Sequence, residues 1–205
     1  MAEETNVVQS ILESVKAIQE GHFVLTSGRH SEYYLNKDAI YVHPFKTAAL
    51  CRRMAAKFYK RFPEVVLAPA LGGIALSQWT ASSLSYLLKY EVLALYAEKT
   101  LNQSDFILSR GYDKLIRGKR ALIVEDVLTT GETVKKIIQL AEEYRATVVG
   151  VAAICNRGNV TASSLGVQDF QSLIDLSFET WEAEKCPLCE MGIPINIGLG
   201  KGAKF

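Results

Sequence analysis

The stretch from residue 120 to 144 constrains the fold of this chain more than any other, because it joins a strand pattern to a turn and a helix pattern. Residues 121–124 form a continuous aliphatic run, which is typical of a strand buried on both faces. Glu125 and Asp126 follow where this strand is expected to emerge, and a turn of two threonines and Gly131 leads into helical spacing. Such a strand–turn–helix unit is the building block of a parallel α/β sheet.

The turn after these two acids has the chemistry of a site for a phosphorylated sugar. A turn that opens a helix presents free backbone N–H groups, which suit a phosphate. Carboxylates are poor phosphate ligands but accept hydrogen bonds from vicinal hydroxyls, so we expect Glu125 and Asp126 to face a ribose diol. The alternative is an ordinary strand-to-helix turn that carries two acids. The turn has neither the Gly-Lys-Ser/Thr of a Walker A loop nor a GxGxxG motif.

Strand and helix patterns alternate along the middle of the chain, which predicts an α/β fold with a parallel sheet flanked by helices. Proline is tolerated at the first helical position, so Pro44 is expected to open a helix. We expect strands at 65–68, 92–96, 120–124 and 147–155, and helices at 44–61, 74–88 and 132–144.

The two ends of the chain do not follow this alternation. The first segment predicts a helix over 7–18 that Gly21 ends, followed by a β-hairpin over 23–36. We therefore expect a single domain, residues 1–205, in which a core of about 44–160 carries a hood over the sheet edge. The expected hood consists of residues 1–40 and about 170–205, and a long polar lid loop covers 99–118.

Composition excludes several classes of protein. Of the 205 residues 49% are hydrophobic and 22% charged, which is ordinary for a globular protein. The net charge of +1 gives no global attraction to nucleic acid or membrane. No apolar run approaches a transmembrane length, and the acidic start lacks the features of a secretory signal, so we expect a cytoplasmic protein.

The cysteines do not form a disulfide framework. Cys51 and Cys155 lie within apolar patterns and are expected to be core thiols. Cys186 and Cys189 form a CPLC pair, which supplies two ligands where a structural zinc usually has four. The three histidines lie far away in sequence, so a reduced thiol pair is favoured over a zinc site, and no protein metal ligand is predicted.

The stretch 120–134 resembles the signature for 5-phosphoribosyl 1-diphosphate (PRPP) in the type I phosphoribosyltransferases: apolar residues, two acids, variable residues, then Thr-Gly and a hydroxyl residue. The turn at 68–73, after an expected strand, resembles the family's pyrophosphate loop, where two glycines allow backbone N–H groups to approach the anion. The resemblance implies that PRPP is bound by Leu71, Gly72, Gly73, Lys99, Glu125, Asp126, Val127, Leu128, Thr129, Thr130, Gly131, Glu132 and Thr133.

The segment 21–35 resembles the hood of orotate phosphoribosyltransferases, whose pattern is G-x-F-x-L-x-S-G-x-x-S followed by two aromatic residues. Asn156-Arg157, just after the last expected core strand, resembles the pair whose arginine faces the orotate carboxylate, which a guanidinium can grip with two bonds. The CPLC segment and Gly192-Ile193-Pro194 resemble one bacterial branch of the same family. The resemblance implies that orotate is bound by Thr26, Tyr33, Tyr34, Thr129 and Arg157.

The chain also departs from the family pattern. Thr26 stands where many members have a lysine, and Glu98 stands where an arginine often precedes the loop lysine. The common lysine- and histidine-containing loop motif is missing, so Arg110 is the candidate for the missing cation. The catalytic residues that the resemblance implies are therefore Lys99, Arg110 and Asp126.

The reaction implied is the transfer of a phosphoribosyl group from PRPP to orotate, with Mg²⁺ held mainly through PRPP oxygens and water. The resemblance also implies a homodimer in which the lid completes the neighbouring subunit's site. Two alternatives stay open: a phosphoribosyltransferase for another base, and a PRPP-sensing regulator without catalytic activity. Regulators of the second kind usually carry an added DNA-binding segment, and this sequence shows none.

Overall fold

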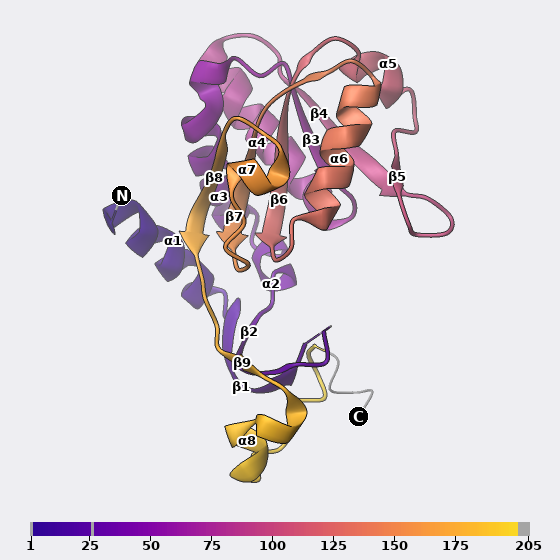
Figure 1. Cartoon of the computed structure of the whole chain (residues 1–205). Coiled ribbons are helices and arrows are strands. Elements are labelled where there is room, and N and C mark those ends of the chain that lie inside the picture. Colours follow the sequence, from indigo (N-terminus) through magenta and orange to yellow (C-terminus); the bar gives the residue numbers. More distant parts are fainter. Residues whose placement is uncertain (1, 26, 201–205) are drawn as a thin grey trace.

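The computed structural model describes residues 2–25 and 27–200, and it contains two separate sheets (Figure 1). The larger sheet has six strands in the order β5-β4-β3-β6-β7-β8. All neighbouring pairs are parallel except β4 and β5. Its strands are β3 (Val65–Pro69), β4 (Leu93–Lys99), β5 (Phe106–Ile107), β6 (Arg120–Leu128), β7 (Thr147–Asn156) and β8 (Phe170–Asp175).

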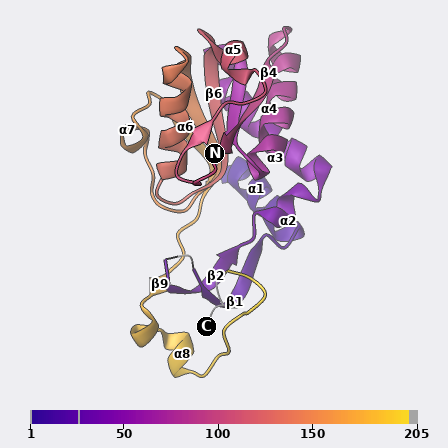
Figure 2. The same cartoon turned by 90° about the vertical axis from the view of Figure 1, so that its right-hand side faces the viewer.

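Helices cover both faces of this sheet, so the predicted α/β class is confirmed (Figure 2). Side chains alternate along each strand, and the two sets enter two different cores. Val66 and Leu122 join the core under α1, α3 and α4, whereas Leu67 and Ile123 join the core under α5, α6 and α7. These helices are α1 (Ala2–Ser14), α3 (Pro44–Phe58), α4 (Gly72–Leu88), α5 (Tyr112–Ile116), α6 (Glu132–Glu143) and α7 (Ala162–Leu165).

The smaller sheet lies at one end of the molecule, in the order β1-β2-β9. Its antiparallel strands are β1 (Ile18–Val24), β2 (His30–Leu35) and β9 (Thr180–Trp181), so the expected hairpin is present. The short α2 (Asp38–Tyr41) leads from it to the core, and η1 (Tyr59–Arg61), η2 (Ala183–Lys185) and α8 (Pro187–Glu190) complete the elements. Within the described residues, no helix is long and apolar enough to cross a membrane.

The first helix ends earlier than its apolar spacing predicts. Lys16 adopts a left-handed conformation with φ 54°, and the Ala17 N–H donates to the Leu12 carbonyl. Ile18 therefore begins β1, and Gly21 lies within that strand at an irregularity in its pairing with β2. The prediction of a helix to residue 18 was wrong because the apolar residues of a strand continued the helical spacing by coincidence.

The segment near residue 170 belongs to the main sheet. β8 pairs in parallel with β7, from Phe170 opposite Val151 to Asp175 opposite Asn156. The expected start of the carboxyl-terminal hood segment at about 170 is therefore too early. α1 likewise packs on the main core through the buried Val8 and Leu12, so the amino-terminal hood begins after this helix.

The polar segment 99–118 is more ordered than a loop. β5 returns antiparallel to the end of β4, with Lys99 opposite Phe106, and α5 follows. The turn between the strands rests on α6 through an ion pair of 3.4 Å between Lys136 Nζ and Asp105 Oδ1. Part of the expected lid loop therefore forms a hairpin with β4 at the edge of the sheet.

Candidate active site

Glu125 and Asp126 lie inside β6 and are 7% and 2% exposed. The sequence predicted that the strand would emerge at these acids, and that prediction was wrong, because β6 continues to Leu128. Buried carboxylates need partners. The Glu125 Oε1 accepts a hydrogen bond from the Asp126 N–H at 2.9 Å, and Asp126 Oδ1 accepts one from the Val127 N–H at 2.7 Å.

Two residues from the segment that connects the small sheet to the core contact the second carboxylate oxygen of Asp126. The Tyr41 hydroxyl donates to Oδ2 at 2.7 Å, and the Lys37 Nζ forms an ion pair with the same atom at 2.9 Å. Burial lowers the pKa of Lys37, but the charge and hydrogen bond of Asp126, together with the charges of Glu125 and Asp38, outweigh it and the net pKa is raised. Burial and the same carboxylate also raise the pKa of Tyr41. The Tyr41 hydroxyl, the Lys37 ammonium and the Val127 N–H therefore fix the orientation of the Asp126 carboxylate.

Among the described residues, no cation forms an ion pair with Glu125. Burial first, and the negative charge of Asp126 second, raise the pKa of Glu125 to about 8. Burial therefore drives Glu125 towards its protonated form, in which the carboxyl group can donate a hydrogen bond.

The turn after β6 opens α6 with a glycine in a left-handed conformation. Gly131 has φ 78°, and a Cβ there would lie 2.8 Å from a methyl group of Leu165, so this position requires glycine. Thr129 and Thr130 are exposed on the turn, whereas the Leu128 side chain is buried and only its backbone reaches this edge. Glu132 pairs with Lys135 at 2.9 Å. The turn therefore presents hydroxyls and N–H groups, as the sequence predicts.

A cavity of about 250 Å³ lies between the turn before α4 and the end of β6, with Thr133 in the first turn of α6 also lining it. Close approach explains the two glycines of the turn before α4: a Cβ on Gly72 would lie 2.9 Å from the Tyr41 ring, and one on Gly73 would lie 2.7 Å from the Ala68 Cβ. The cavity is lined by Lys37, Pro69, Ala70, Leu71, Gly72, Gly73, Lys99, Phe106, Glu125, Asp126, Val127 and Thr133.

The two predicted cations are placed differently. Lys99 lines this cavity, together with the acids. Arg110 does not line it, because its guanidinium pairs with Glu98 at 3.1 Å. Glu98 directly precedes Lys99 on β4, so the two side chains point to opposite faces of the strand. The hydroxyl of Ser109 first, and Arg110 second, lower the pKa of Glu98. Within a single chain, Arg110 is therefore separated from the acids.

A second cavity, of about 520 Å³, adjoins the first at Lys37, Asp126 and Val127. Predicted base-binding residues Tyr34, Thr129 and Arg157 line it. Thr26 lies outside the described residues, although Leu25 and Ser27 on either side of it also line this cavity. The remaining lining residues are Leu35, Asn36, Asp38 and Gly200.

Arg157 is held at the wall of this second cavity. Its backbone N–H donates to the Leu128 carbonyl at 2.7 Å, and its guanidinium lies 5.0 Å from the centre of the Phe178 ring. Burial lowers the pKa of Arg157, yet it stays charged at any ordinary pH. Tyr33 stacks on the same Phe178 ring that Arg157 contacts, with ring centres 5.5 Å apart. Tyr33 does not line the cavity, because it points to the opposite face of β2 from Tyr34.

Comparison with known proteins decides the family. The family described as "Phosphoribosyl transferase domain" matches residues 38–180. An orotate phosphoribosyltransferase of Caldanaerobacter subterraneus subsp. tengcongensis is 38% identical over 192 residues, which cover 94% of this chain and 95% of the relative. The chain belongs to the orotate phosphoribosyltransferase family.

Solved structures of this family share the fold. A Mycobacterium tuberculosis orotate phosphoribosyltransferase in complex with inorganic phosphate matches with a TM-score of 0.66 at 20% identity, over 86% of this chain and 97% of that one. A complex of the M. tuberculosis enzyme with PRPP matches with a TM-score of 0.63 at 23% identity, over 82% and 96%. These likenesses concern the arrangement of sheet and helices.

Three residues that contact the predicted orotate phosphoribosyltransferase site were missed from the sequence. Lys37 and Tyr41 bond Asp126, and Phe178 stacks beside Arg157. The sequence carried one usable signal: Lys37 is a cation only two residues beyond the segment 21–35. Tyr41 and Phe178 carried none, because an aromatic residue in a short connection equally fits packing.

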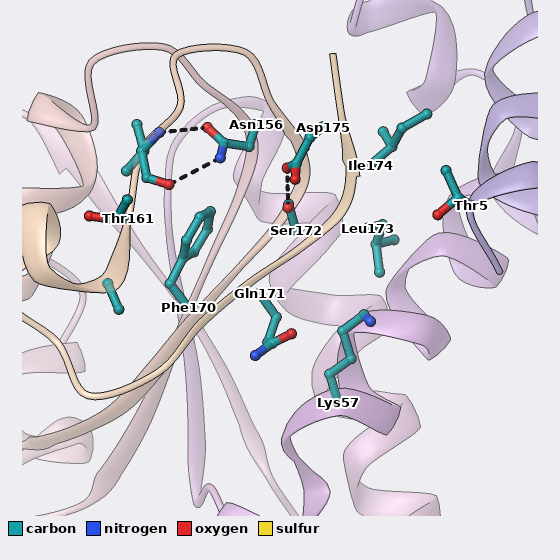
Figure 3. A pocket seen from close by; sticks show the side chains of 12 residues that line it. Thr5, Lys57, Asn156, Thr161, Phe170, Gln171, Ser172, Leu173, Ile174 and Asp175 are labelled. Atoms are coloured by element: carbon teal, nitrogen blue, oxygen red, sulfur yellow. Dashed lines mark hydrogen bonds between the residues drawn. The ribbon is translucent and has the colours of Figure 1, made fainter. Parts of the chain in front are cut away.

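A third cavity, of about 440 Å³, lies along β8 and does not include the acids (Figure 3). Two of its polar side chains have partners within the lining: Asn156 both donates to and accepts from the backbone of Val160 at 3.0 Å, and Ser172 donates to Asp175 at 2.5 Å. None of the residues predicted to bind PRPP or orotate lines it.

Proposed function

We propose that this protein catalyses the transfer of the 5-phosphoribosyl group from PRPP to orotate, giving orotidine 5′-monophosphate and pyrophosphate, a step of pyrimidine nucleotide synthesis in the cytoplasm. The observation that carries the proposal is that Asp126 lines two adjoining cavities. One cavity has the glycine turn and Lys99, which suit a pyrophosphate. The other has Arg157, which suits a planar carboxylate. The ribose of PRPP would lie between them.

In the proposed reaction, N1 of orotate attacks C1′ while the bond from C1′ to the pyrophosphate oxygen breaks. Positive charge grows on the ribose ring and negative charge on the leaving group. The charged carboxylate of Asp126, held by Lys37 and Tyr41, would stabilise the ring. Lys99 and the N–H groups of the turn at 71–73 would stabilise the pyrophosphate. Orotate already ionises at N1, so a dedicated base is not required.

The arrangement of the two acids bears on how the Mg²⁺ that the family typically uses with PRPP would be held. Asp126 is already paired with Lys37, and Glu125 has a raised pKa, so neither is arranged as a bare carboxylate ligand. We propose that Mg²⁺ is held through pyrophosphate and ribose oxygens and water, with the two acids bonding the ribose hydroxyls. When bound, the ion would neutralise charge on the leaving pyrophosphate.

We further propose a homodimer in which Arg110 reaches the neighbouring subunit's site. Lys99 lines the cavity of its own chain, whereas Arg110 lies on the other face of β4 and is 59% exposed in its side chain. α4 also exposes large apolar side chains, among them Trp79 at 40% and Tyr86 at 75%, which is typical of a surface that contacts another protein.

The proposed activity is tested with a panel of bases: orotate, uracil, adenine, guanine and hypoxanthine, each with PRPP and Mg²⁺, with pyrophosphate release as the readout. We expect release with orotate alone. Faster release with a base that lacks a carboxylate would replace the proposal by a phosphoribosyltransferase for another base. Binding of PRPP without release from any base would indicate a sensing role.

A further inference from the structure

Four potential metal ligands meet beside the small sheet. His22 in β1 and His30 at the start of β2 lie against two cysteines. Cys186 directly precedes α8, and Cys189 lies within it. One ligand atom from each lies within 4.8 Å of the others. His22, His30 and Cys186 are buried, and Cys189 is exposed. The sequence favoured a reduced thiol pair because these residues are distant along the chain, and the fold removes that objection.

Three nitrogen–sulfur distances match a tetrahedral site. A zinc ion with ordinary bond lengths holds a sulfur and a nitrogen ligand about 3.6 Å apart. Here His22 Nε2 lies 3.6 Å from Cys186 Sγ and 3.7 Å from Cys189 Sγ, and His30 Nδ1 lies 3.4 Å from Cys189 Sγ. The two nitrogens are 2.8 Å apart and would separate to about 3.3 Å around the ion.

The outer surroundings of His22 also suit a metal ligand. Its Nδ1 lies 2.7 Å from the Ile193 carbonyl oxygen, which can only accept, so Nδ1 carries the proton. The lone pair of a neutral ring then lies on Nε2, the atom that points at His30 and both sulfurs. A histidine ligand is commonly oriented in this way by a carbonyl on its second nitrogen.

We propose that His22 Nε2, His30 Nδ1, Cys186 Sγ and Cys189 Sγ bind one Zn²⁺ as a closed structural site. Four protein ligands leave no position for a substrate, which is the mark of a structural zinc. Two thiolates and two imidazoles also select zinc over the Mg²⁺ proposed to bind with PRPP, since Mg²⁺ prefers oxygen. The ion would join the amino-terminal hairpin to a segment more than 150 residues later in the chain.

The zinc would fix the segment that returns to the base cavity. After α8, the Asn196 N–H donates to the His22 carbonyl at 2.7 Å, and Gly200 lies so close to the Val24 carbonyl that a Cβ would be 2.6 Å from it. Gly200 lines the same cavity as Arg157. α8 itself is only four residues long and lies at the far end of the small sheet (Figure 1). A bound metal would therefore stabilise the position of this short helix.

The test uses the full-length protein, purified under reducing conditions and reconstituted with Zn²⁺ alone. Elemental analysis after gel filtration should give about one zinc per chain. Replacement by Co²⁺ should give the intense visible absorption of a tetrahedral ion and a charge-transfer band from thiolate. Protein that retains no zinc, or a cobalt spectrum without the thiolate band, would overturn the proposal.

Variants locate the ion. Cys189→Ser, at an exposed position, should lower retained zinc at least tenfold, and His30→Ala should do the same. Cys51→Ala and His43→Ala are matched controls, since they remove a thiol and an imidazole outside the cluster, and each should retain the metal. Equal zinc in Cys189→Ser and in the wild type, with folding verified by circular dichroism, would refute the assignment. If His30→Ala does not fold, the cobalt spectrum of Cys189→Ser decides, because the thiolate band should weaken.

Discussion

Replacement of Asp126 by asparagine tests the two roles that the structure gives this residue. The substitution keeps the size and one carbonyl oxygen but removes the charge. Asp126 is buried and bonded by Tyr41, Lys37 and the Val127 N–H. An effect on stability is therefore expected as well as an effect on catalysis, unlike the small structural cost that an exposed strand end would imply.

The magnitude follows from these contacts. A hydrogen bond to a charged group is worth about 1.5–3 kcal/mol, and the ion pair with Lys37 is worth less, because the Lys37 side chain is 46% exposed. Asparagine can still accept one bond, so we expect the free energy of unfolding to fall by about 2 kcal/mol. Loss of a charge that faces a developing cation should lower kcat/KM by about 10²–10³-fold.

The assay combines urea unfolding with initial rates of orotate consumption at saturating PRPP and Mg²⁺. Tyr41→Phe is the matched control, because it removes one bond to Asp126 and leaves the charge. It should lose about 1 kcal/mol of stability and much less activity than Asp126→Asn. A folded Asp126→Asn protein with a kcat/KM within a factor of about three of the wild type would refute the assigned role.

Further predictions concern the other charged residues of the site. The pKa of Glu125 is raised from 4.5 to about 8, so its ionisation disfavours the folded state as pH rises through that range. The stability of Glu125→Gln relative to the wild type should therefore rise progressively from pH 5 to 8. A pH-independent difference in urea midpoints would contradict this. Arg157→Lys should raise the KM for orotate about tenfold and leave that for PRPP nearly unchanged, since an ammonium cannot form the paired bonds; an equal rise in both would mean that Arg157 does not face the base. Inactive Arg110→Ala and Asp126→Asn proteins should regain activity when mixed, because one site of the hybrid dimer has neither defect; no recovery, with subunit exchange verified, would place Arg110 in its own chain's site.

The sequence predicted the sheet and the glycine turn that opens α6 well because both depend on local pattern. The aliphatic run before Glu125 and the glycine at 131 act through strand burial and backbone conformation, which neighbouring residues determine. The end of β6 was mispredicted for a physical reason. Two acids normally indicate solvent, and here Lys37 and Tyr41 allow Asp126 to be buried. Nothing local to β6 specifies those partners.

The remaining misses also come from contacts between distant segments. Tyr33 and Tyr34 are equivalent in the motif, and only the pairing of β2 determines that Tyr34 faces Arg157. The His22 and Cys186 cluster forms because β9 brings the carboxyl-terminal segment to the hairpin. Sequence spacing alone cannot supply a ligand set that two segments share.

The position of orotidine 5′-monophosphate in a crystal structure of its complex with the protein tests the central claim most directly, because this one molecule carries the phosphate, the ribose and the base carboxylate. We predict the 5′-phosphate on the turn at 127–131, the ribose hydroxyls within hydrogen-bond distance of Glu125 and Asp126, and the carboxylate against Arg157. A phosphate on the glycine turn at 71–73, or a carboxylate that faces Lys99 instead of Arg157, would contradict the account.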